Sequence, residues 1–288
     1  MDLAQAIDGT AVKNATRDQW DRSAPGWNSH GPQIRAWLAQ ATAAMIDMAG
    51  IRPGHRVLDV AAGAGDQTLD IAARVGPQGS VLATDISAAI LAFAAKNARQ
   101  AGYANVETLV ADGEALGLAP SSFDAAVSRL GLMFFPDPLQ GLREIHRALK
   151  PGGLVCTMVF SSPQANPCVA AVMQTALKHA GQAPADPFRP GSLMSLGKPG
   201  LIDDLFRQAG FADVATTKVS APFRLPSARD YLAFIRSSAS PVLQILGRLD
   251  EAAREAAWVE MEEKLQAFNT SDGAWAGPNE LLLTAGRR

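Results

Sequence analysis

The sequence predicts an α/β fold with a mostly parallel sheet, because short apolar segments rich in β-branched residues alternate with helical segments through its first half. Five strands are expected, at residues 56–61, 80–85, 106–112, 123–129 and 154–160. Helices are expected at 66–75, 87–100 and 139–149, and Ser87 is the expected N-cap of the second of them. Such βαβ units require parallel strands and right-handed crossovers. A Lys-Pro-Gly-Gly turn at 150–153 is expected to separate the last of these helices from the fifth strand.

Helical segments flank this alternating region. Residues 14–48 have a helical pattern with breaks expected at Pro25–Gly26 and Gly31–Pro32. After the fifth strand we expect a helix at 167–180, a Pro/Gly-rich loop up to 198, a helix at 201–209 and a strand at 211–220. Residues 227–268 are expected to be mostly helical, with an interruption near Ser240–Pro241, and a terminal strand is expected at 279–286. The expected divisions are an N-terminal helical cap (1–50), a core (51–161), an insertion (162–198) and a C-terminal part of the same sheet with a helical insertion (199–288).

The insertion is placed to act as a lid. In open α/β sheets, ligands bind outside the carboxyl ends of the strands. Residues 162–198 leave the sheet at the carboxyl end of the fifth strand, and their prolines and glycines suit a loop with hinges. We therefore expect 162–198, together with the segment around Trp27, to close over a bound ligand and shape its pocket; the alternative is an inert surface excursion.

Composition narrows the class of protein. The chain has 288 residues, of which 48% are hydrophobic and 19% charged, as in a globular protein. Its formal net charge of −2 argues against nucleic acid as the main partner. Two cysteines cannot form a disulfide framework or a cysteine-only zinc site, and no metal is expected. We expect a cytoplasmic location, because neither a signal-peptide pattern nor a stretch of about 18 apolar residues is found.

Four motifs point to a nucleotide-like ligand. A buried strand runs into a turn containing Gly63 and Gly65, where a ligand can approach the backbone and the next helix. Asp85 ends the second strand, where a carboxylate can accept hydrogen bonds from both ribose hydroxyls. The Asp-Gly-Glu sequence at 112–114 follows the third strand and could contact an adenine edge, and the turn at 150–153 precedes the fifth strand. The combination and its order make the signal specific.

In this combination the sequence resembles the class I S-adenosylmethionine-dependent methyltransferases over residues 52–160, with weaker agreement at both ends. The most similar subgroup is that of the ubiquinone/menaquinone biosynthesis C-methyltransferases and related small-molecule enzymes. The resemblance implies a Rossmann-like, seven-stranded, mostly parallel sheet whose last strand, at 280–284, is antiparallel. It also implies S-adenosylmethionine as methyl donor, S-adenosylhomocysteine as product, and a core at 51–161 that binds this cofactor.

The resemblance further implies which residues contact the cofactor. The glycine turn would pass close to the methionyl part, Asp85 would hold the ribose, and Ile86 would pack on the adenine. Trp27, the last residue of the segment WDRSAPGW at 20–27, resembles an aromatic residue that closes over the cofactor in relatives. The implied cofactor-binding residues are Trp27, Asp59, Gly63, Gly65, Asp85, Ile86, Asp112, Gly113, Glu114, Arg129 and Leu130.

One departure from the subgroup concerns the acceptor. The quinone C-methyltransferases have Gly-(Ile/Leu)-Arg-Asn after the fourth strand, whereas this chain has Gly-Leu-Met-Phe at 131–134. Losing the arginine and asparagine removes polar groups, so we expect an apolar or aromatic acceptor; the alternative is that these residues belong to the core. The expected acceptor-binding residues are Met133, Phe134, Met173 and Met194.

Catalysis would require little beyond positioning. Transfer of a methyl group is an in-line displacement in which the protein holds the acceptor and excludes water. A base is needed only where the acceptor must lose a proton. His30, beside Trp27, is the candidate base, and a surface or capping histidine is the alternative.

We therefore expect O-, N- or C-methylation of a small molecule, as in secondary metabolism, with a homodimer left open. The alternative is a non-catalytic cofactor-binding protein with a regulatory or scaffold role. A nicotinamide dinucleotide site is disfavoured because Thr68 stands where its third glycine is required. Methylation of arsenic is discarded because Cys156 and Cys168 cannot supply several converging thiolates.

Overall fold

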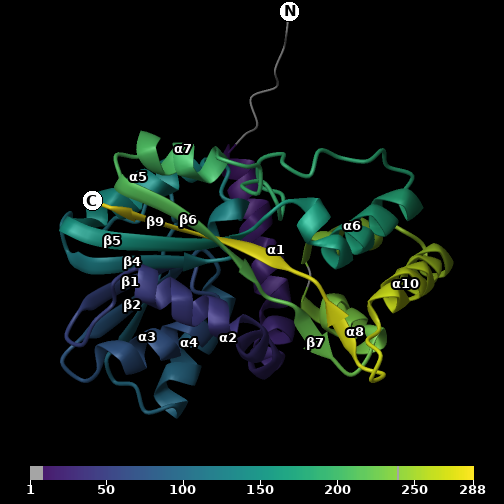
Figure 1. Ribbon diagram of the computed structural model, residues 1–288, viewed down its shortest axis with the longest axis horizontal. Coiled ribbons are helices and arrows are strands. Elements are labelled where there is room, and N and C mark those ends of the chain that lie inside the picture. The colour runs from purple at the N-terminus through teal and green to yellow at the C-terminus, as the bar shows by residue number, and fades with distance from the viewer. Residues whose placement is uncertain (1–8, 239) are drawn as a thin grey trace, which may run out of the picture.

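The sheet is the frame on which the rest of the molecule is arranged (Figure 1). The computed structural model describes residues 9–238 and 240–288. Within them, the main sheet has seven strands in the order β3-β2-β1-β4-β5-β9-β6. They are β1 (Arg56–Val60), β2 (Ser80–Asp85), β3 (Val106–Val110), β4 (Phe123–Arg129), β5 (Leu149–Phe160), β6 (Ala212–Ser220) and β9 (Glu280–Arg287). Only β9 is antiparallel to its neighbours β5 and β6, which confirms the expected mostly parallel, Rossmann-like sheet and its antiparallel last strand.

Helices cover both faces of the sheet. The regular helices are α1 (Gly9–Ser29), α2 (Gly31–Met48), α3 (Asp66–Val75), α4 (Ala88–Gln100), α5 (Pro138–Ala148), α6 (Pro167–His179), α7 (Leu201–Gln208), α8 (Ala228–Ser238), α9 (Ser240–Leu246) and α10 (Glu251–Leu265). Short 3₁₀ turns cover Leu132–Phe134, Pro163–Ala165 and Gln266–Phe268. Helices α2 to α4 lie on one face of the sheet, and α5 and α7 lie on the other (Figure 1).

Local sequence signals account for most of these boundaries. Helix α4 begins after Ser87, whose Oγ accepts a hydrogen bond from the amide of Ile90, so the expected N-cap is confirmed. The expected break at Gly31–Pro32 is also confirmed, because α1 ends at Ser29 and α2 begins at Gly31. The expected turn at 150–153 is instead an irregularity within β5, which already begins at Leu149.

The expected break at Pro25–Gly26 is wrong, because α1 continues through Pro25 to Ser29. A proline inside a helix removes one hydrogen bond and crowds the preceding turn, so tertiary packing must compensate. The neighbouring Ala24 is fully buried, and a Cβ atom at Gly26 would lie 1.9 Å from the carbonyl oxygen of Ser237. Close packing of α1 against α8 therefore holds this helix continuous.

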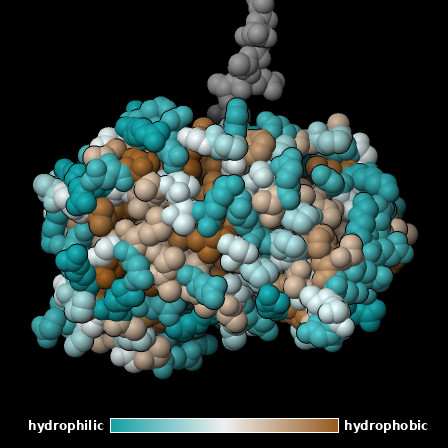
Figure 2. Space-filling model, viewed as in Figure 1, coloured by the Kyte–Doolittle hydropathy of each residue, from teal (hydrophilic) through white to brown (hydrophobic). Residues whose placement is uncertain are grey.

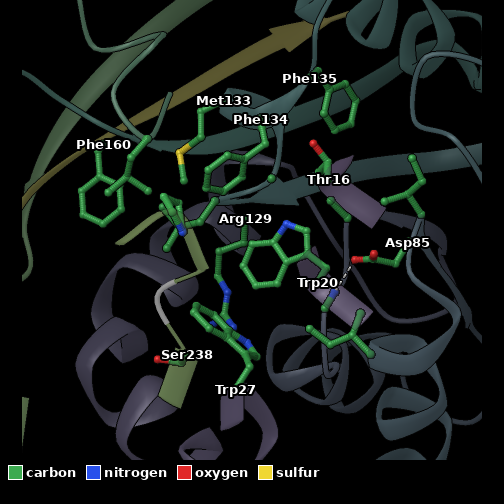
Figure 3. Close-up of a pocket in the computed structure, with 18 of the residues that line it drawn as sticks. Thr16, Trp20, Trp27, Asp85, Arg129, Met133, Phe134, Phe135, Phe160 and Ser238 are labelled. Atoms are coloured by element: carbon green, nitrogen blue, oxygen red, sulfur yellow. Dashed lines mark hydrogen bonds between the residues drawn. The ribbon is translucent and has the colours of Figure 1, made fainter. Parts of the chain in front are cut away.

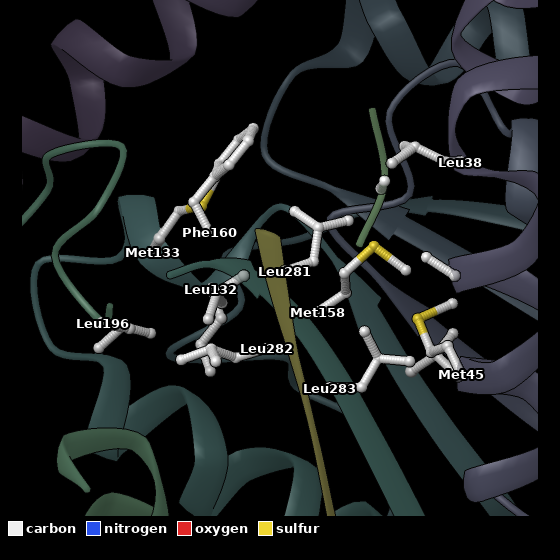
Figure 4. Close-up of a cluster of buried hydrophobic side chains, with 14 of the residues drawn as sticks. Leu38, Met45, Leu132, Met133, Met158, Phe160, Leu196, Leu281, Leu282 and Leu283 are labelled. Carbon is white, nitrogen blue, oxygen red and sulfur yellow. The ribbon is translucent and has the colours of Figure 1, made fainter. Parts of the chain in front are cut away.

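The core lies on both sides of β9 (Figure 4). Leu281, Leu282 and Leu283 are consecutive and at most 6% exposed, as expected for a strand buried on both faces. Successive side chains of a strand point to opposite faces, so Leu282 packs near Leu132 while Leu283 lies on the side of Met45 (Figure 4). Strand β9 is therefore covered by core residues on both faces of the sheet.

A second group of elements lies beside the sheet, beyond α1 (Figure 1). It contains α6, α8, α9 and α10 and a two-stranded sheet that the sequence pattern did not reveal, formed by β7 (Phe223–Leu225) and β8 (Trp275–Gly277). Residues 1–8 of the expected N-terminal cap lie outside the described residues. On the face shown in Figure 2, hydrophobic residues form small patches between hydrophilic ones. None of the helices in the described part of the chain is long and apolar enough to cross a membrane.

Candidate functional site

A large cavity opens at the carboxyl ends of β1, β2, β4 and β5, between the sheet and the second group of elements (Figure 3). It is therefore at the edge where ligands bind in open α/β sheets. Most of the residues expected to bind cofactor or acceptor line it: Trp27, Gly63, Asp85, Ile86, Asp112, Gly113, Glu114, Arg129, Leu130, Met133, Phe134 and Met173. The fold thus brings together side chains from segments that are far apart in the sequence.

The backbone at the cavity edge adopts conformations that are rare for residues with side chains. Gly63 and Gly65 have φ of 59° and 87°, which suits glycine at these positions. Ala61 and Leu130, at the ends of β1 and β4, also have positive φ, of 57° in each case. Positive φ in residues other than glycine is uncommon and clusters at functional sites. The two strand ends therefore hold the glycine turn and the end of β4 in a fixed, strained shape beside the cavity.

Asp85 connects the second strand to the glycine turn. Its Oδ2 atom accepts a hydrogen bond from the amide of Gly63 at 3.0 Å, and its Oδ1 atom accepts one from the amide of Ser87 at 2.9 Å. The residue is 8% exposed, and this burial raises the pKa of its carboxyl to about 6. Each carboxylate oxygen has a second lone pair, so Asp85 can still accept hydrogen bonds from two ligand hydroxyls.

The Asp-Gly-Glu segment lies against the first helix. Lys13 of α1 forms ion pairs with Asp112 at 2.7 Å and with Glu114 at 2.5 Å. The other oxygen of Glu114 accepts a hydrogen bond from the amide of Asp137. A Cβ atom at Gly113 would lie 2.2 Å from the ring of Phe135. Glu114 thus joins α1 to the start of α5, whereas the backbone of Gly113 borders the cavity.

Two further buried charged groups, Asp59 and Arg129, lie near the glycine turn. Asp59 is fully buried and accepts hydrogen bonds from Thr68 Oγ1 at 2.6 Å and Gln67 Nε2 at 3.1 Å, while burial raises the pKa of its carboxyl to about 6. The guanidinium of Arg129 donates to Thr42 Oγ1 at 3.2 Å, and its Nη2 atom lies 3.6 Å from Asp66 Oδ2. Arg129 is the buried cation at the centre of the cavity wall (Figure 3).

Aromatic side chains close the cavity on the side of α1. Trp20 contacts Trp27 edge-to-face with ring centroids 5.6 Å apart and lies 5.8 Å from the ring of Phe134 (Figure 3). The indole nitrogen of Trp27 lies 3.7 Å from where a Cβ atom of Gly63 would stand. Helix α1 therefore places Trp27 beside the glycine turn and Trp20 against both Trp27 and Phe134.

The half of the cavity farther from Asp85 is uncharged and mostly apolar. Its lining residues carry no charge: Trp37, Met133, Phe134, Phe160, Val169, Val172, Met173, Leu193, Phe223, Tyr231, Phe234, Ile235, Ser238, Pro241, Val242 and Asn279. They come from α2, the 3₁₀ turn after β4, β5, α6, β7, α8, α9 and the loops around them. An uncharged ligand with a large apolar surface would bury that surface here without desolvating a charged side chain.

Four of the expected site residues do not line the cavity. Asp59 and Gly65 lie under or beyond the glycine turn, and Met194 is 5% exposed in the core next to Leu193, which does line the cavity. The ring of His30 packs edge-on against Phe234, and its Nδ1 atom lies 2.9 Å from the carbonyl oxygen of Gly26. None of the four histidines is among the lining residues.

Several lining residues were missed from the sequence. Lys13, Thr16 and Trp20 of α1 were missed because no local pattern shows which face of this helix turns toward the strand ends. Phe223, Tyr231 and Phe234 belong to the second group of elements, whose place beside the strand ends only the tertiary structure shows. The unusual density of tryptophans in residues 20–37 was the one local signal that pointed to this region.

The sheet order, the glycine turn and the acidic residues after the second and third strands agree with the Rossmann-like architecture that the resemblance to the S-adenosylmethionine-dependent methyltransferases implied. A profile of the ubiE/COQ5 methyltransferase family matches residues 33–221, more than half of the chain, and the chain belongs to this family.

Curated relatives agree with this family over the core of the chain. The chain is 41% identical over 125 residues to the ubiquinone/menaquinone biosynthesis C-methyltransferase UbiE of Hahella chejuensis, which covers 43% of this chain and 50% of the relative. It is 38% identical over 123 residues to UbiE of Pasteurella multocida, and this match covers 42% of this chain and 46% of the relative. The match thus spans about half the length of these relatives, and the remaining parts are not aligned.

Solved structures share the fold at low sequence identity. The YcgJ protein of Bacillus subtilis has a TM-score of 0.58 at 20% identity, with 87% of this chain and 98% of that chain covered. Phosphoethanolamine N-methyltransferase 2 of Haemonchus contortus has a TM-score of 0.60 at 18% identity, with 94% of this chain and 60% of that chain covered. The [4+2]-cyclase SpnF has a TM-score of 0.55 at 18% identity, covering 93% and 96%. The fold alone therefore does not determine the reaction.

Proposed function

We propose that the protein transfers the methyl group of S-adenosylmethionine to a small, uncharged acceptor with an apolar or aromatic surface. The observation that carries the proposal is the division of one cavity into two chemically different halves. The half at the glycine turn holds Asp85, Asp112 and Arg129, whereas the other half is lined by uncharged, mostly apolar and aromatic residues.

The residues of the first half suit the chemical groups of this cofactor. Asp85 would accept hydrogen bonds from the ribose hydroxyls, and Ile86 and the backbone of Gly113 would border the adenine. Arg129 is a buried cation placed to meet the methionyl carboxylate, and the tryptophans of α1 would exclude water above it. The bound cofactor would supply an electrophilic methyl group on a sulfonium.

The second half would position the acceptor rather than activate it. Methyl transfer requires the acceptor atom to lie in line with the breaking bond from sulfur to carbon, and a close-fitting apolar wall provides that orientation. Because neither a histidine nor a carboxylate is among the described residues that line this half, the acceptor atom would react as a neutral nucleophile or lose its proton to solvent. Met133 and Phe134 stand in the place of the polar pair of the quinone enzymes, and both line this half.

The loop after α6 would act as a lid over this half of the cavity. Leu193 contributes its side chain to the lining, and the Ser195 hydroxyl donates a hydrogen bond to the carbonyl oxygen of Met133 at 2.6 Å. This contact ties the segment to the 3₁₀ turn that carries the acceptor wall. Movement of the lid would therefore open the acceptor half and leave the glycine turn in place.

Incubation with S-adenosylmethionine labelled in its methyl group tests the proposal. We expect labelled product from at least one member of a panel of phenols, amines and polyketides, together with an equal amount of S-adenosylhomocysteine. Asp85→Ala serves as the matched control and is expected to lose both products. Cofactor binding by calorimetry without any methylated product from the panel or from cell extracts would favour the non-catalytic alternative instead.

A further inference from the structure

The acceptor half holds a buried polar atom for which the described residues supply no hydrogen-bond partner. Asn279 lines the cavity and is 4% exposed, and its side-chain oxygen Oδ1 is buried without a hydrogen bond to any described residue. Buried amide oxygens are nearly always paired, so an unpaired one next to a cavity is a place where a ligand can donate a hydrogen bond.

Neighbouring groups fix the orientation of the Asn279 amide. Its Nδ2 atom donates to the carbonyl oxygen of Gly277 at 3.2 Å. Turning the amide over would place Oδ1 against that carbonyl oxygen, so the acceptor atom must point away from Gly277. The backbone is equally constrained, because the carbonyl of Asn279 accepts from the amide of Ala221 at 2.8 Å and the next amide, of Glu280, donates to Asn166 Oδ1 at 3.0 Å.

A second uncharged polar group belongs to the same part of the cavity. Tyr231 also lines it and is 3% exposed. Its ring stacks on Trp275 at 4.7 Å and meets Phe223 edge-to-face at 5.7 Å, and Phe223 pairs with Gly277 across β7 and β8. In the described part of the chain, no residue forms a hydrogen bond with the Tyr231 hydroxyl. Burial raises the pKa of this hydroxyl, which therefore stays neutral at physiological pH.

These groups lie far from the expected position of the transferred methyl. Asn279 directly precedes β9, which is separated from β4 by β5. Neighbouring strands are about 4.8 Å apart, so Asn279 lies on the order of 10 Å from the carboxyl end of β4, across the sheet. That is comparable to the length of a two-ring aromatic molecule.

We propose that Asn279 and Tyr231 form the specificity subsite of the acceptor, which recognises a neutral hydroxyl group at the end of an aromatic acceptor opposite to the methylated atom. The ligand hydroxyl would donate to Asn279 Oδ1 and accept from the Tyr231 hydroxyl. The aromatic residues around the rest of the cavity would contact the rings of the acceptor. This inference rests on the proposed function, which determines which end of the acceptor faces the transferred methyl group. The subsite itself is testable by binding alone.

Matched pairs of probes test it on the full chain in the presence of S-adenosylhomocysteine. Phenol and anisole form one pair, and naphthol and its methyl ether form the other; each ether retains the rings but cannot donate. Binding is measured by quenching of tryptophan fluorescence and by calorimetry. We expect each hydroxyl compound to bind the wild-type protein about 10- to 100-fold more tightly than its ether.

Two substitutions assign this preference to the subsite. Asn279→Leu should remove most of the preference by weakening only the hydroxyl compounds, and Tyr231→Phe should reduce it without affecting the ethers. Asn105→Leu is the matched control, because Asn105 also donates its amide to a backbone carbonyl, that of Gly76, but does not line the cavity. It should leave the preference unchanged.

Equal affinities within both pairs, no binding of any probe, or an unchanged preference in both variants would overturn the inference. If Asn279→Leu does not fold, the wild-type pairs and Tyr231→Phe decide the question. Calorimetry with S-adenosylhomocysteine alone keeps the two proposals apart. Loss of cofactor binding would count against the methyltransferase proposal, whereas a missing hydroxyl preference in a protein that binds the cofactor would count against the subsite only.

Discussion

The Oδ2 atom of Asp85 accepts a hydrogen bond of 3.0 Å from the backbone amide of Gly63, across 22 residues of sequence. This bond joins the end of β2 to the glycine turn after β1. The carboxylate that is expected to hold the ribose therefore also fixes the backbone that is expected to border the methionyl part. The two contacts to one cofactor are structurally coupled.

The first prediction follows from this coupling. Asp85→Ala removes a charge-assisted acceptor of the ribose hydroxyls and also the anchor of Gly63, so we expect a loss of about 1.5–3 kcal/mol in binding of S-adenosylhomocysteine. Calorimetry measures the loss. Asp47→Ala is the control, because Asp47 is a surface carboxylate paired with Arg74 away from the cavity. Unchanged affinity in Asp85→Ala would show that Asp85 does not hold the cofactor.

The second prediction concerns pH. Burial raises the pKa of Asp85 to about 6, and the ionised carboxylate is the better acceptor for ribose hydroxyls. Cofactor affinity should therefore be full above the pKa and fall as the pH is lowered through it, by up to about tenfold per pH unit.

Calorimetric titrations with S-adenosylhomocysteine on both sides of this pKa measure the effect. Burial also raises the pKa of Asp59 to about 6, so a comparison with Asp85→Asn is needed. That variant should bind more weakly and lose the part of the pH dependence that belongs to Asp85. A profile identical to that of the wild type would assign the titration to another group.

The third prediction concerns Gly113. A Cβ atom at this position would lie 2.2 Å from Cζ of Phe135, whose ring also lies 2.6 Å from where a Cβ atom of Gly141 would stand. Because the ring is confined by both glycines, Gly113→Ala should lower the free energy of unfolding by about 1–3 kcal/mol. Urea unfolding measures this change. Gly9→Ala, whose Cβ would meet no atom of the described residues within 4 Å, should have little effect, and Phe135→Leu should partly rescue Gly113→Ala.

The fourth prediction concerns the loop after α6. If residues 181–198 act as a lid, chymotrypsin should cleave after Phe188 more slowly when cofactor and acceptor are bound. Cleavage after Tyr103, which lies between α4 and β3 away from the cavity, provides the internal control. Deleting part of the loop should lower acceptor turnover and leave affinity for S-adenosylhomocysteine largely intact. Equal cleavage rates in both states, with turnover preserved after the deletion, would contradict the lid.

The sequence by itself determined the frame of the protein. The bounds of β2 and β4, those of β1 to within one residue, the N-cap Ser87 and the apolar run at 281–283 follow from local patterns. Capping, strand alternation and burial on both faces depend on neighbouring residues. Since the carboxyl ends of parallel strands meet at one edge of the sheet, the same patterns also predicted that the glycine turn, Asp85 and Asp112 lie close together.

Only the tertiary structure decided how the cavity is closed. Helix α1 continues through Pro25 because packing against α8 outweighs the lost hydrogen bond, and this places Trp27 beside the glycine turn. The pairing of β7 with β8 joins residues about 50 positions apart, so no local pattern could reveal that Asn279 and Tyr231 border the same cavity. Contacts between distant segments depend on the packing of the whole chain, and at this site those contacts shape the acceptor half.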